Sequence, residues 1–158
     1  MTALVASDFE TLAGSVRAAD LVVARGAGTH SGIGGPVPWD AVDVSAPMGI
    51  VEIQPADMTV TVLAGTPVAV LSAALAEHGQ ECPLDPETAR ATVGGVLATG
   101  LSGRRRLGLG PVRDTVLEVV LVLADGRVVR GGGPTVKNVT GYDLPRLVVG
   151  SQIGRAHV

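Results

Sequence analysis

Glycine is concentrated in two short segments of this sequence, and these segments limit what the chain can fold into. The chain has 22 glycines among its 158 residues, about twice the usual share of roughly 7%. One cluster lies in residues 26–35, after the apolar run at 21–24, and the second lies in residues 94–100. Because glycine has no Cβ, a ligand or a second chain segment can approach the backbone closely there. We therefore expect strands and helices joined by loops that hold a ligand.

Two helices are predicted in the first half of the chain. Ser7 and Glu10 have the spacing of a capping box, which starts a helix that runs to about Ala19. A second helix is expected to be capped by Thr66 and to end at Gly79. The apolar face of the second helix is expected to hold Val70, Leu71, Ala74 and Leu75.

Strands are predicted where short apolar or alternating runs lie between turn residues. In the first half these runs are 21–24, which reads as a buried strand, 42–44, 50–53 and 59–63. In the second half, 116–123 and 127–130 flank Ala124-Asp125-Gly126, and Asp-Gly favours a hairpin because it tolerates positive φ. The sequence has no internal repeat. It predicts an α+β fold, with a boundary near residue 85 between a mixed first lobe and an antiparallel second lobe.

Composition excludes several classes of protein. With 12 Lys and Arg against 15 Asp and Glu, the net charge is −3, so no nucleic-acid-binding face is expected. Charged residues make up 17% and the mean hydropathy is +0.41, which excludes a disordered chain and a coiled coil. Three isolated histidines lack ligand spacing, so no metal site is expected. The single cysteine, Cys82, is expected to be a small buried hydrophobic residue in a reducing compartment.

No targeting or membrane-spanning segment is expected. Asp8 and Glu10 interrupt the N-terminus before the apolar region of a signal peptide could form. Residues 58–76 carry no charge and approach the ~20 residues that a membrane-spanning helix needs, but Gly65-Thr66-Pro67 interrupts them. A strand followed by a helix is expected there instead, and the chain is predicted to be cytoplasmic.

The segment after the first apolar run is the first candidate site. Gly26 and Gly28 would let consecutive N–H groups curl into a concave nest that binds oxyanions, and Thr29 and Ser31 add hydroxyl donors. A plain glycine-rich loop is the alternative. A Rossmann turn needs a third glycine where Ser31 stands and a helix that Pro36-Val37-Pro38 prevents. The predicted ligand is therefore a phosphate or pyrophosphate. The candidate residues are Arg25, Gly26, Ala27, Gly28, Thr29, His30 and Ser31.

The second glycine cluster is the second candidate site. Thr92 can cap a short helix whose first turn carries Gly94 and Gly95. A planar or phosphate-bearing ligand would then reach the bare backbone closely, whereas close helix packing is the alternative. Two such clusters, one in each predicted lobe, favour a single ligand held between the lobes.

Several motifs occur in order along the chain. They are residues 25–31, Gly65-Thr66-Pro67, Gln80 with Pro83 and Pro86, Thr92-Val93-Gly94-Gly95, Gly110-Pro111-Val112-Arg113-Asp114 and Lys137-Asn138-Val139-Thr140-Gly141-Tyr142-Asp143-Leu144. Over about residues 20–152 the chain resembles the FAD-binding domain of the vanillyl-alcohol oxidase/p-cresol methylhydroxylase (PCMH) superfamily, and within it the FAD-binding subunits of bacterial glycolate oxidases. The resemblance implies a two-lobed PCMH-type fold with lobe 1 at about 1–85 and lobe 2 at about 86–152.

The resemblance also implies which residues hold FAD. Residues 25–31 match the first pyrophosphate-binding loop of the family. The second flavin-contacting segment would comprise Thr92, Val93, Gly94, Gly95, Ala98 and Gly100, and Gly141 and Asp143 would lead to the last flavin contacts. Some relatives attach the flavin covalently through a His at the place of Thr29, so noncovalent FAD is expected here.

The implied function is that of the FAD-binding subunit of a glycolate-oxidase-like complex, which oxidises a 2-hydroxy acid to a 2-oxo acid. Its expected partners are a second flavoprotein subunit, which carries the substrate site, and an iron–sulfur subunit. The complex would be cytoplasmic, with peripheral association to the inner membrane left open. A stand-alone D-lactate-type dehydrogenase and a scaffold subunit with a weak or empty flavin site are the alternatives.

Some features stay open at this level. No catalytic residue is identified. Tyr142 would either lie near the isoalloxazine ring or anchor the core, and Arg104-Arg105-Arg106 would form either a docking or anion-contacting patch or a solvated loop. The family pattern breaks after Ser151. We therefore expect one FAD-binding domain over 1–158 that is incomplete at its C-terminus, a non-native tail at 153–158, and no activity from the isolated chain.

Overall fold

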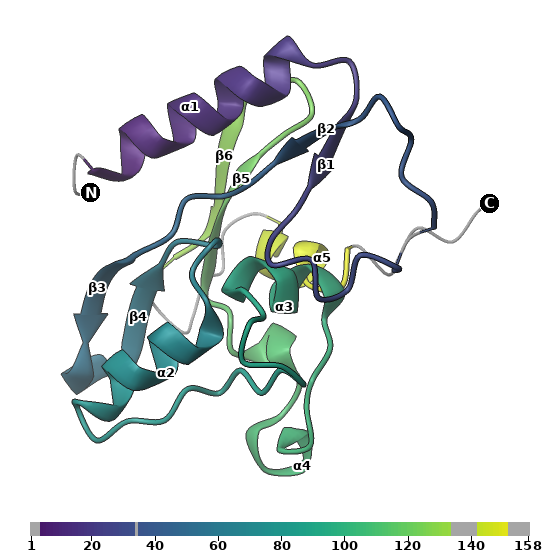
Figure 1. The fold of residues 1–158 in the computed structure, drawn as a ribbon. Helices are drawn as coiled ribbons and strands as arrows, with labels where there is room; N and C mark the ends of the chain where they lie inside the picture. The colour runs from purple at the N-terminus through teal and green to yellow at the C-terminus, as the bar shows by residue number, and fades with distance from the viewer. Residues whose placement is uncertain (1–3, 34, 134–141, 152–158) are drawn as a thin grey trace.

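The computed structural model describes residues 4–33, 35–133 and 142–151, and in that part of the chain helices and short strands alternate (Figure 1). The helices are α1 (Leu4–Ala18), α2 (Val68–Ala76), α3 (Val93–Thr99), α4 (Arg106–Leu109) and α5 (Leu144–Val148), with 3-10 turns η1 (Pro55–Asp57) and η2 (Val112–Asp114). The strands are β1 (Val22–Ala24), β2 (Val42–Val44), β3 (Ile50–Gln54), β4 (Thr59–Val62), β5 (Glu118–Val122) and β6 (Val128–Gly132).

The strands of the described residues form three separate pairs. β1 and β2 are parallel, with Val22 opposite Val42, and a long connection without a helix joins them. β3 with β4 and β5 with β6 are antiparallel. The predicted hairpin turn is confirmed, because Gly126 has a φ of 77° between β5 and β6. At the same turn the backbone and side-chain N–H groups of Arg127 donate to Asp125, which lowers the pKa of that carboxyl.

α1 packs against elements from both halves of the sequence. It contacts β2 and also β5, and Figure 1 shows it crossing beside β5 and β6. The hairpin turn fits closely, since a Cβ on Gly126 would overlap the stem of Arg17 and the carbonyl of Ala13 on α1. The N-terminal helix is thereby fixed to the C-terminal hairpin.

The main hydrophobic cluster consists of aliphatic side chains and lies around α2 and α3. Its buried members are Val68, Leu71, Leu75, Cys82, Leu84, Ala91, Val93, Val96 and Val112. Cys82 is a small buried hydrophobic residue there, as predicted. The cluster draws members from both sides of residue 85, so the predicted division into lobes at that residue stays a prediction.

Two predicted helix starts are wrong. α1 begins at Leu4, so Ser7 lies inside the helix rather than at its N-cap; the Leu and Ala that precede Ser7 favour helix strongly enough to extend it. The N-cap of α2 is Pro67 rather than Thr66, because the carbonyl of Ala91 already accepts from the N–H of Val68.

The apolar face and the end of α2 also differ from the prediction. α2 ends at Ala76 and continues as a turn to Gly79, which has a φ of 68°. Val70 is exposed, and the buried face consists of Val68, Leu71 and Leu75. Leu71 and Leu75 of the predicted face are buried and Ala74 is half-buried. β1, predicted as a buried strand, is only half-buried, since the described residues place no second neighbour beside it.

Thr66 has a different role from the predicted one. Its side chain is 1% exposed, and its hydroxyl accepts from the N–H of Gly49 at 2.8 Å and donates to the carbonyl of Gly49 at 3.1 Å. One hydroxyl therefore satisfies two backbone groups of the segment that leads into β3.

We expect Thr66→Val in the full-length protein to lower the free energy of unfolding by about 2 kcal/mol, because it leaves the part-buried N–H of Gly49 without a partner and removes one of the two donors to the carbonyl of Gly49. Thr61→Val, at an exposed position of β4, serves as the control and should change stability little. Denaturant titration measures both. Equal stability of the two variants would contradict the role of Thr66.

Candidate functional site

The first glycine loop is fixed at its base by β2. The N–H of Arg25 donates to the carbonyl of Val44, and the hydroxyl of Ser45 donates to the carbonyl of Arg25, each at 2.9 Å. The Nε of Arg25 lies 2.7 Å from Asp43 Oδ2 in an exposed ion pair. Arg25, where the loop leaves β1, is thus held by three successive residues, Asp43, Val44 and Ser45.

Beyond that base, the loop leaves its amides available. Within the described part of the chain, the N–H groups of residues 26–31 have no hydrogen-bond acceptor. Gly28 has a φ of 70° with open space beside it, a conformation that favours glycine. Thr29 Oγ1 lies 3.1 Å from Nδ1 of His30. Successive N–H groups without internal partners are what an anion-binding nest requires.

The two glycine clusters meet at one contact. A Cβ on Gly26 would overlap Oγ1 of Thr92, so only glycine fits there. The same Oγ1 accepts from the N–H of Gly95 at 3.2 Å and so caps α3, as predicted. In Figure 1 the connection between β1 and β2 passes beside α3. The first glycine loop therefore touches the start of α3 where Gly26 meets Thr92.

The first three N–H groups of α3 donate within the protein. The N–H of Val93 donates to the carbonyl of Thr66 at 2.9 Å, and that of Gly94 to the carbonyl of Ala64 at 2.8 Å. Gly95 donates to the cap, so the three first amides of the helix are already used. Gly94 also packs against Ala64 without room for a Cβ. At Gly94 the missing Cβ therefore serves close packing within the protein, the alternative left open for this cluster.

The other predicted residues have mixed placements. Ala98 is half-buried on α3. Gly100 ends that helix with a φ of 63° and lies against Gly150, whose N–H donates to Leu97 at 2.9 Å. Asp143 caps α5, accepting from the N–H of Arg146 at 3.1 Å. Gly141 lies outside the described residues. The structure thus brings residues 25–31 and the start of α3 together, whereas Asp143 already has a partner in its own helix.

Sequence reasoning did not single out Asp43 and Ser45, which hold Arg25. Both lie on an ordinary-looking short strand or directly after it, and their link to the loop depends on the parallel pairing of β1 with β2. The one available signal was the opposite charge of Arg25, directly after one predicted strand, and Asp43, within another; the sequence alone does not show that these strands pair.

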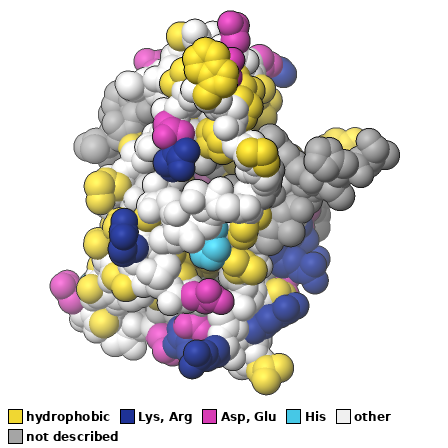
Figure 2. Space-filling view, turned by 45° about the vertical axis from the view of Figure 1, so that its right-hand side comes forward, with side chains coloured by type: hydrophobic (Ala, Val, Ile, Leu, Met, Phe, Trp, Pro, Cys, Tyr) yellow, Lys and Arg dark blue, Asp and Glu magenta, His cyan; other side chains and the backbone are white. Residues whose placement is uncertain are grey.

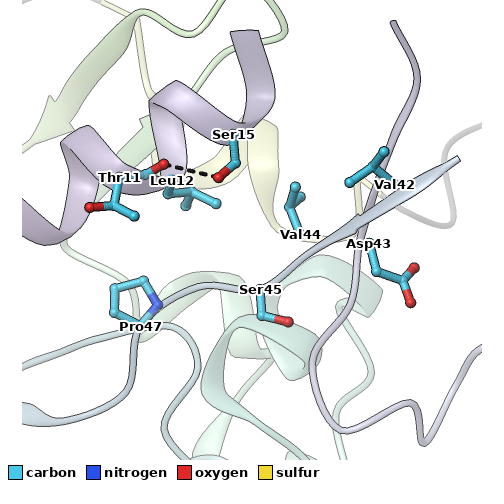
Figure 3. A pocket seen from close by; sticks show the side chains of 8 residues that line it. All are labelled: Thr11, Leu12, Ser15, Val42, Asp43, Val44, Ser45 and Pro47. Atoms are coloured by element: carbon cyan, nitrogen blue, oxygen red, sulfur yellow. Dashed lines mark hydrogen bonds between the residues drawn. The ribbon is translucent and has the colours of Figure 1, made fainter. Parts of the chain in front are cut away.

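A recess of about 340 Å³ lies beside this base, between α1 and β2 (Figure 3). Its polar side chains are engaged: Ser15 donates to the carbonyl of Thr11, Ser45 to that of Arg25, and Asp43 pairs with Arg25. None of the candidate residues lines it. The lining residues are Thr11, Leu12, Ser15, Val42, Asp43, Val44, Ser45 and Pro47. The recess therefore lacks the free donors that a pyrophosphate needs, and the glycine loops remain the candidate site.

The structure bears on the alternatives left open for Tyr142 and for residues 104–106. Tyr142 is 93% exposed, so the expectation that it anchors the core is wrong. Arg105 is an anchor, since it pairs with Glu81 and donates to the carbonyl of Cys82 at 2.7 Å. Arg104 and Arg106 are exposed.

Comparison with known proteins agrees with the geometry. The family model described as "FAD binding domain" matches residues 5–132. The chain belongs to this FAD-binding domain family. FAD is its cofactor, as predicted, and its relatives are FAD-linked oxidoreductases.

Two relatives are each 41% identical to the chain. Glycolate oxidase subunit GlcE of Escherichia coli aligns over 132 residues, 82% of this chain and 38% of that protein. A D-lactate dehydrogenase of Archaeoglobus fulgidus aligns over 133 residues, 83% of this chain and 30% of that protein. The chain therefore spans about a third of the length of these relatives.

The fold is also similar to that of a solved structure. An alkyldihydroxyacetonephosphate synthase superposes with a TM-score of 0.74 at 21% identity, over 92% of this chain and 27% of that one. This supports the predicted PCMH-type fold class. In the residues that the structure describes, no helix is long and apolar enough to span a membrane. The same residues contain no group of His, Cys, Asp or Glu side chains suited to a metal ion.

We expect Gly26→Ala to separate the two loops, because its Cβ would overlap Oγ1 of Thr92. The full-length protein should lose about 2 kcal/mol of stability and bind less flavin. Gly32→Ala, with nothing within 4 Å of the added Cβ, is the control.

A double-mutant cycle isolates the contact. Thr92→Ala removes the overlapping oxygen at the expense of the cap, so Gly26→Ala should destabilise the Thr92→Ala protein by at least about 1 kcal/mol less than it destabilises the wild type. Additive effects in denaturant titrations would show that Gly26 and Thr92 do not touch.

Proposed function

We propose that the chain is the FAD-binding part of a subunit of a glycolate-oxidase-like complex that oxidises a 2-hydroxy acid to a 2-oxo acid. The observation that carries the proposal is the meeting of residues 25–31, with their unpartnered amides, and the start of α3 at the contact between Gly26 and Thr92. The names of the relatives, a glycolate oxidase subunit and a D-lactate dehydrogenase, supply the substrate class.

The residues present fit FAD in a particular way. The amides of residues 26–31 would hold the pyrophosphate, since a chain of net charge −3 has no general attraction for a dianion. Thr92, Val93, Gly94 and Gly95, with Ala98 and Gly100 further along α3, would provide close contact for the flavin through bare backbone. Gly141 and Asp143 would complete the site. Thr29 stands where covalent relatives have His, so the FAD is noncovalent.

Bound FAD would supply the redox chemistry, accepting two electrons from the alcohol carbon of the substrate. The chain's own residues bind and orient the cofactor. Among the candidate residues that the structure describes, the acidic and basic side chains are Arg25, His30 and Asp143, and each already has a hydrogen-bond partner. We therefore propose that a second flavoprotein subunit carries the substrate site. An iron–sulfur subunit would take the electrons, and the chain alone would be inactive.

The A. fulgidus relative favours a second candidate, a stand-alone D-lactate-type dehydrogenase. In either case we propose a cytoplasmic location, which agrees with the single cysteine. Peripheral contact with the inner membrane would come only through the complex.

The function is tested on the full-length protein, alone and together with its partner subunits. Purified protein should carry a flavin that acid precipitation releases as FAD into the supernatant. Glycolate or D-lactate should bleach the absorbance of the bound flavin under anaerobic conditions only when the second flavoprotein subunit is present. Bleaching without it would favour the stand-alone dehydrogenase. A flavin-free protein that still assembles would favour the scaffold, and flavin in the acid pellet would contradict noncovalent binding.

Gly95→Ala separates cofactor contact from folding. Gly95 lies on α3, where alanine favours helix by up to about 1 kcal/mol, and the added Cβ would meet only Oγ1 of Thr92 at 3.1 Å. We expect unchanged stability of the apoprotein within about 1 kcal/mol and at least tenfold weaker FAD affinity, because the Cβ covers the bare backbone. Gly108→Ala on α4 is the control. Unchanged FAD affinity, measured by fluorescence titration, would place the flavin elsewhere.

A further inference from the structure

The segment at β2 holds three groups of Arg25. The N–H of Arg25 donates to the carbonyl of Val44, its carbonyl accepts from the hydroxyl of Ser45, and its Nε donates to Oδ2 of Asp43 at 2.7 Å. The parallel pairing of β1 with β2 places Val23 opposite Asp43. Because side chains alternate along extended chain, Arg25 lies on the same face as Val23 and Asp43. The contact between the two charged side chains is therefore a consequence of the strand register.

The ion pair between Arg25 and Asp43 adds little to the stability of the fold. The two side chains are 37% and 53% exposed, and exposed ion pairs contribute little because water screens them. The hydrogen bonds to Val44 and Ser45 already fix the main chain of Arg25. What the carboxylate of Asp43 adds is a fixed orientation of the guanidinium.

The contact with Asp43 occupies one nitrogen of the guanidinium and leaves the other two. Asp43 accepts from Nε, and neither Nη group of Arg25 has a hydrogen-bond partner among the residues that the structure describes. The Nη groups of arginine are N–H donors on a rigid planar fork. Such a fork matches the oxygens of a phosphate. Arg25 thus keeps donors for an anion while its Nε is anchored.

Arg25 directly precedes the amides that we assign to the pyrophosphate, those of residues 26–31. It is the only Lys or Arg in residues 25–31. The connection between β1 and β2 lies on the right of Figure 1, and this side comes forward in Figure 2, where charged side chains of both signs border a pale area of backbone and small side chains. With mixed charges on this face and a net charge of −3, an anion depends on donors that are directed at it.

We propose that Asp43 is a positioning residue, which holds Arg25 through Nε so that the Nη groups donate to the pyrophosphate of FAD beside the amides of residues 26–31. The inference rests on the proposed function, because it takes FAD as the ligand of that loop.

The proposal and simple charge repulsion predict opposite effects of removing Asp43. A carboxylate near the loop repels a dianion, so by charge alone a variant without it would bind FAD more tightly. If the carboxylate orients Arg25, the same variant binds FAD more weakly. The sign of the change in affinity therefore distinguishes the two.

The chain offers a matched control at the turn between β5 and β6. Oδ2 of Asp125 also accepts from the Nε of an arginine, Arg127, at 2.6 Å, and the side chain of Asp125 is 51% exposed. No candidate FAD residue lies in that turn. Asp125→Ala therefore removes the same charge and the same kind of contact as Asp43→Ala, outside the segments assigned to FAD.

The experiment measures the FAD affinity of the full-length apoprotein by fluorescence titration. We expect Asp43→Ala to weaken the affinity at least about fivefold, since an oriented charge-assisted contact is lost. Asp43→Asn keeps an oxygen that can accept from Nε and should retain most of the affinity. Asp125→Ala should bind FAD as the wild type does.

A second set of variants tests whether Asp43 acts through Arg25. Arg25→Met should weaken FAD affinity and reduce its dependence on salt, because a cation on the pyrophosphate is removed. In the Arg25→Met protein, Asp43→Ala should cause no further loss. Denaturant titration of the apoproteins should give similar midpoints for Asp43→Ala and Asp125→Ala. A much lower midpoint for Asp43→Ala would show a structural role and overturn the proposal.

The outcomes separate this inference from the proposed function. If Asp43→Ala binds FAD as tightly as the wild type or more tightly, Asp43 is not a positioning residue, and the proposed function still stands. An equal loss of affinity from Asp43→Ala in the wild-type and Arg25→Met proteins would overturn the inference in the same way, as would an Asp43→Asn protein as weak as Asp43→Ala. A wild-type protein that binds no FAD would overturn both.

Discussion

The contact between Gly26 and Thr92 is the constraint on which the candidate site depends. Thr92 caps α3, and the next N–H along the chain donates to the carbonyl of Thr66, whose hydroxyl holds Gly49 before β3. A loop that leaves β1 is thereby tied, through one buried threonine after another, to the hydrophobic cluster around α2 and α3. The flexible-looking glycine segment is positioned by the core.

The two glycine clusters differ in how the fold uses their backbone amides. In residues 26–31 the glycines keep N–H groups free of internal partners, which suits a charged pyrophosphate. At Gly94 and Gly95 the amides donate within the fold, and the missing Cβ atoms let Ala64 and Thr92 pack closely against α3. The same residue type therefore serves hydrogen bonding at one segment and close approach at the other. Directed donors also explain how an acidic chain can bind an anion.

Local signals were predictable from sequence, and long-range choices were not. Asp125-Gly126 and Thr92 encode their turn and cap within a few residues, and both predictions are confirmed. Thr66 failed as a predicted cap because its hydroxyl has better partners in Gly49, 17 residues away. Arg25 likewise meets Asp43 only because β1 and β2 run parallel. Where a side chain can bond either to a neighbour in sequence or to a distant strand, the tertiary fold determines which partner it takes.

Aromatic residues are scarce in this chain, and the core is built without them. Buried volume comes from valine, leucine, alanine and one cysteine, as the composition indicated, so the fold needs no aromatic anchor. Of three aromatic residues, Trp39 and Tyr142 are almost fully exposed. Neither of these two side chains contributes to the core. The stability of this fold therefore comes from aliphatic packing and from the threonine and backbone hydrogen bonds that join its loops to α2 and α3.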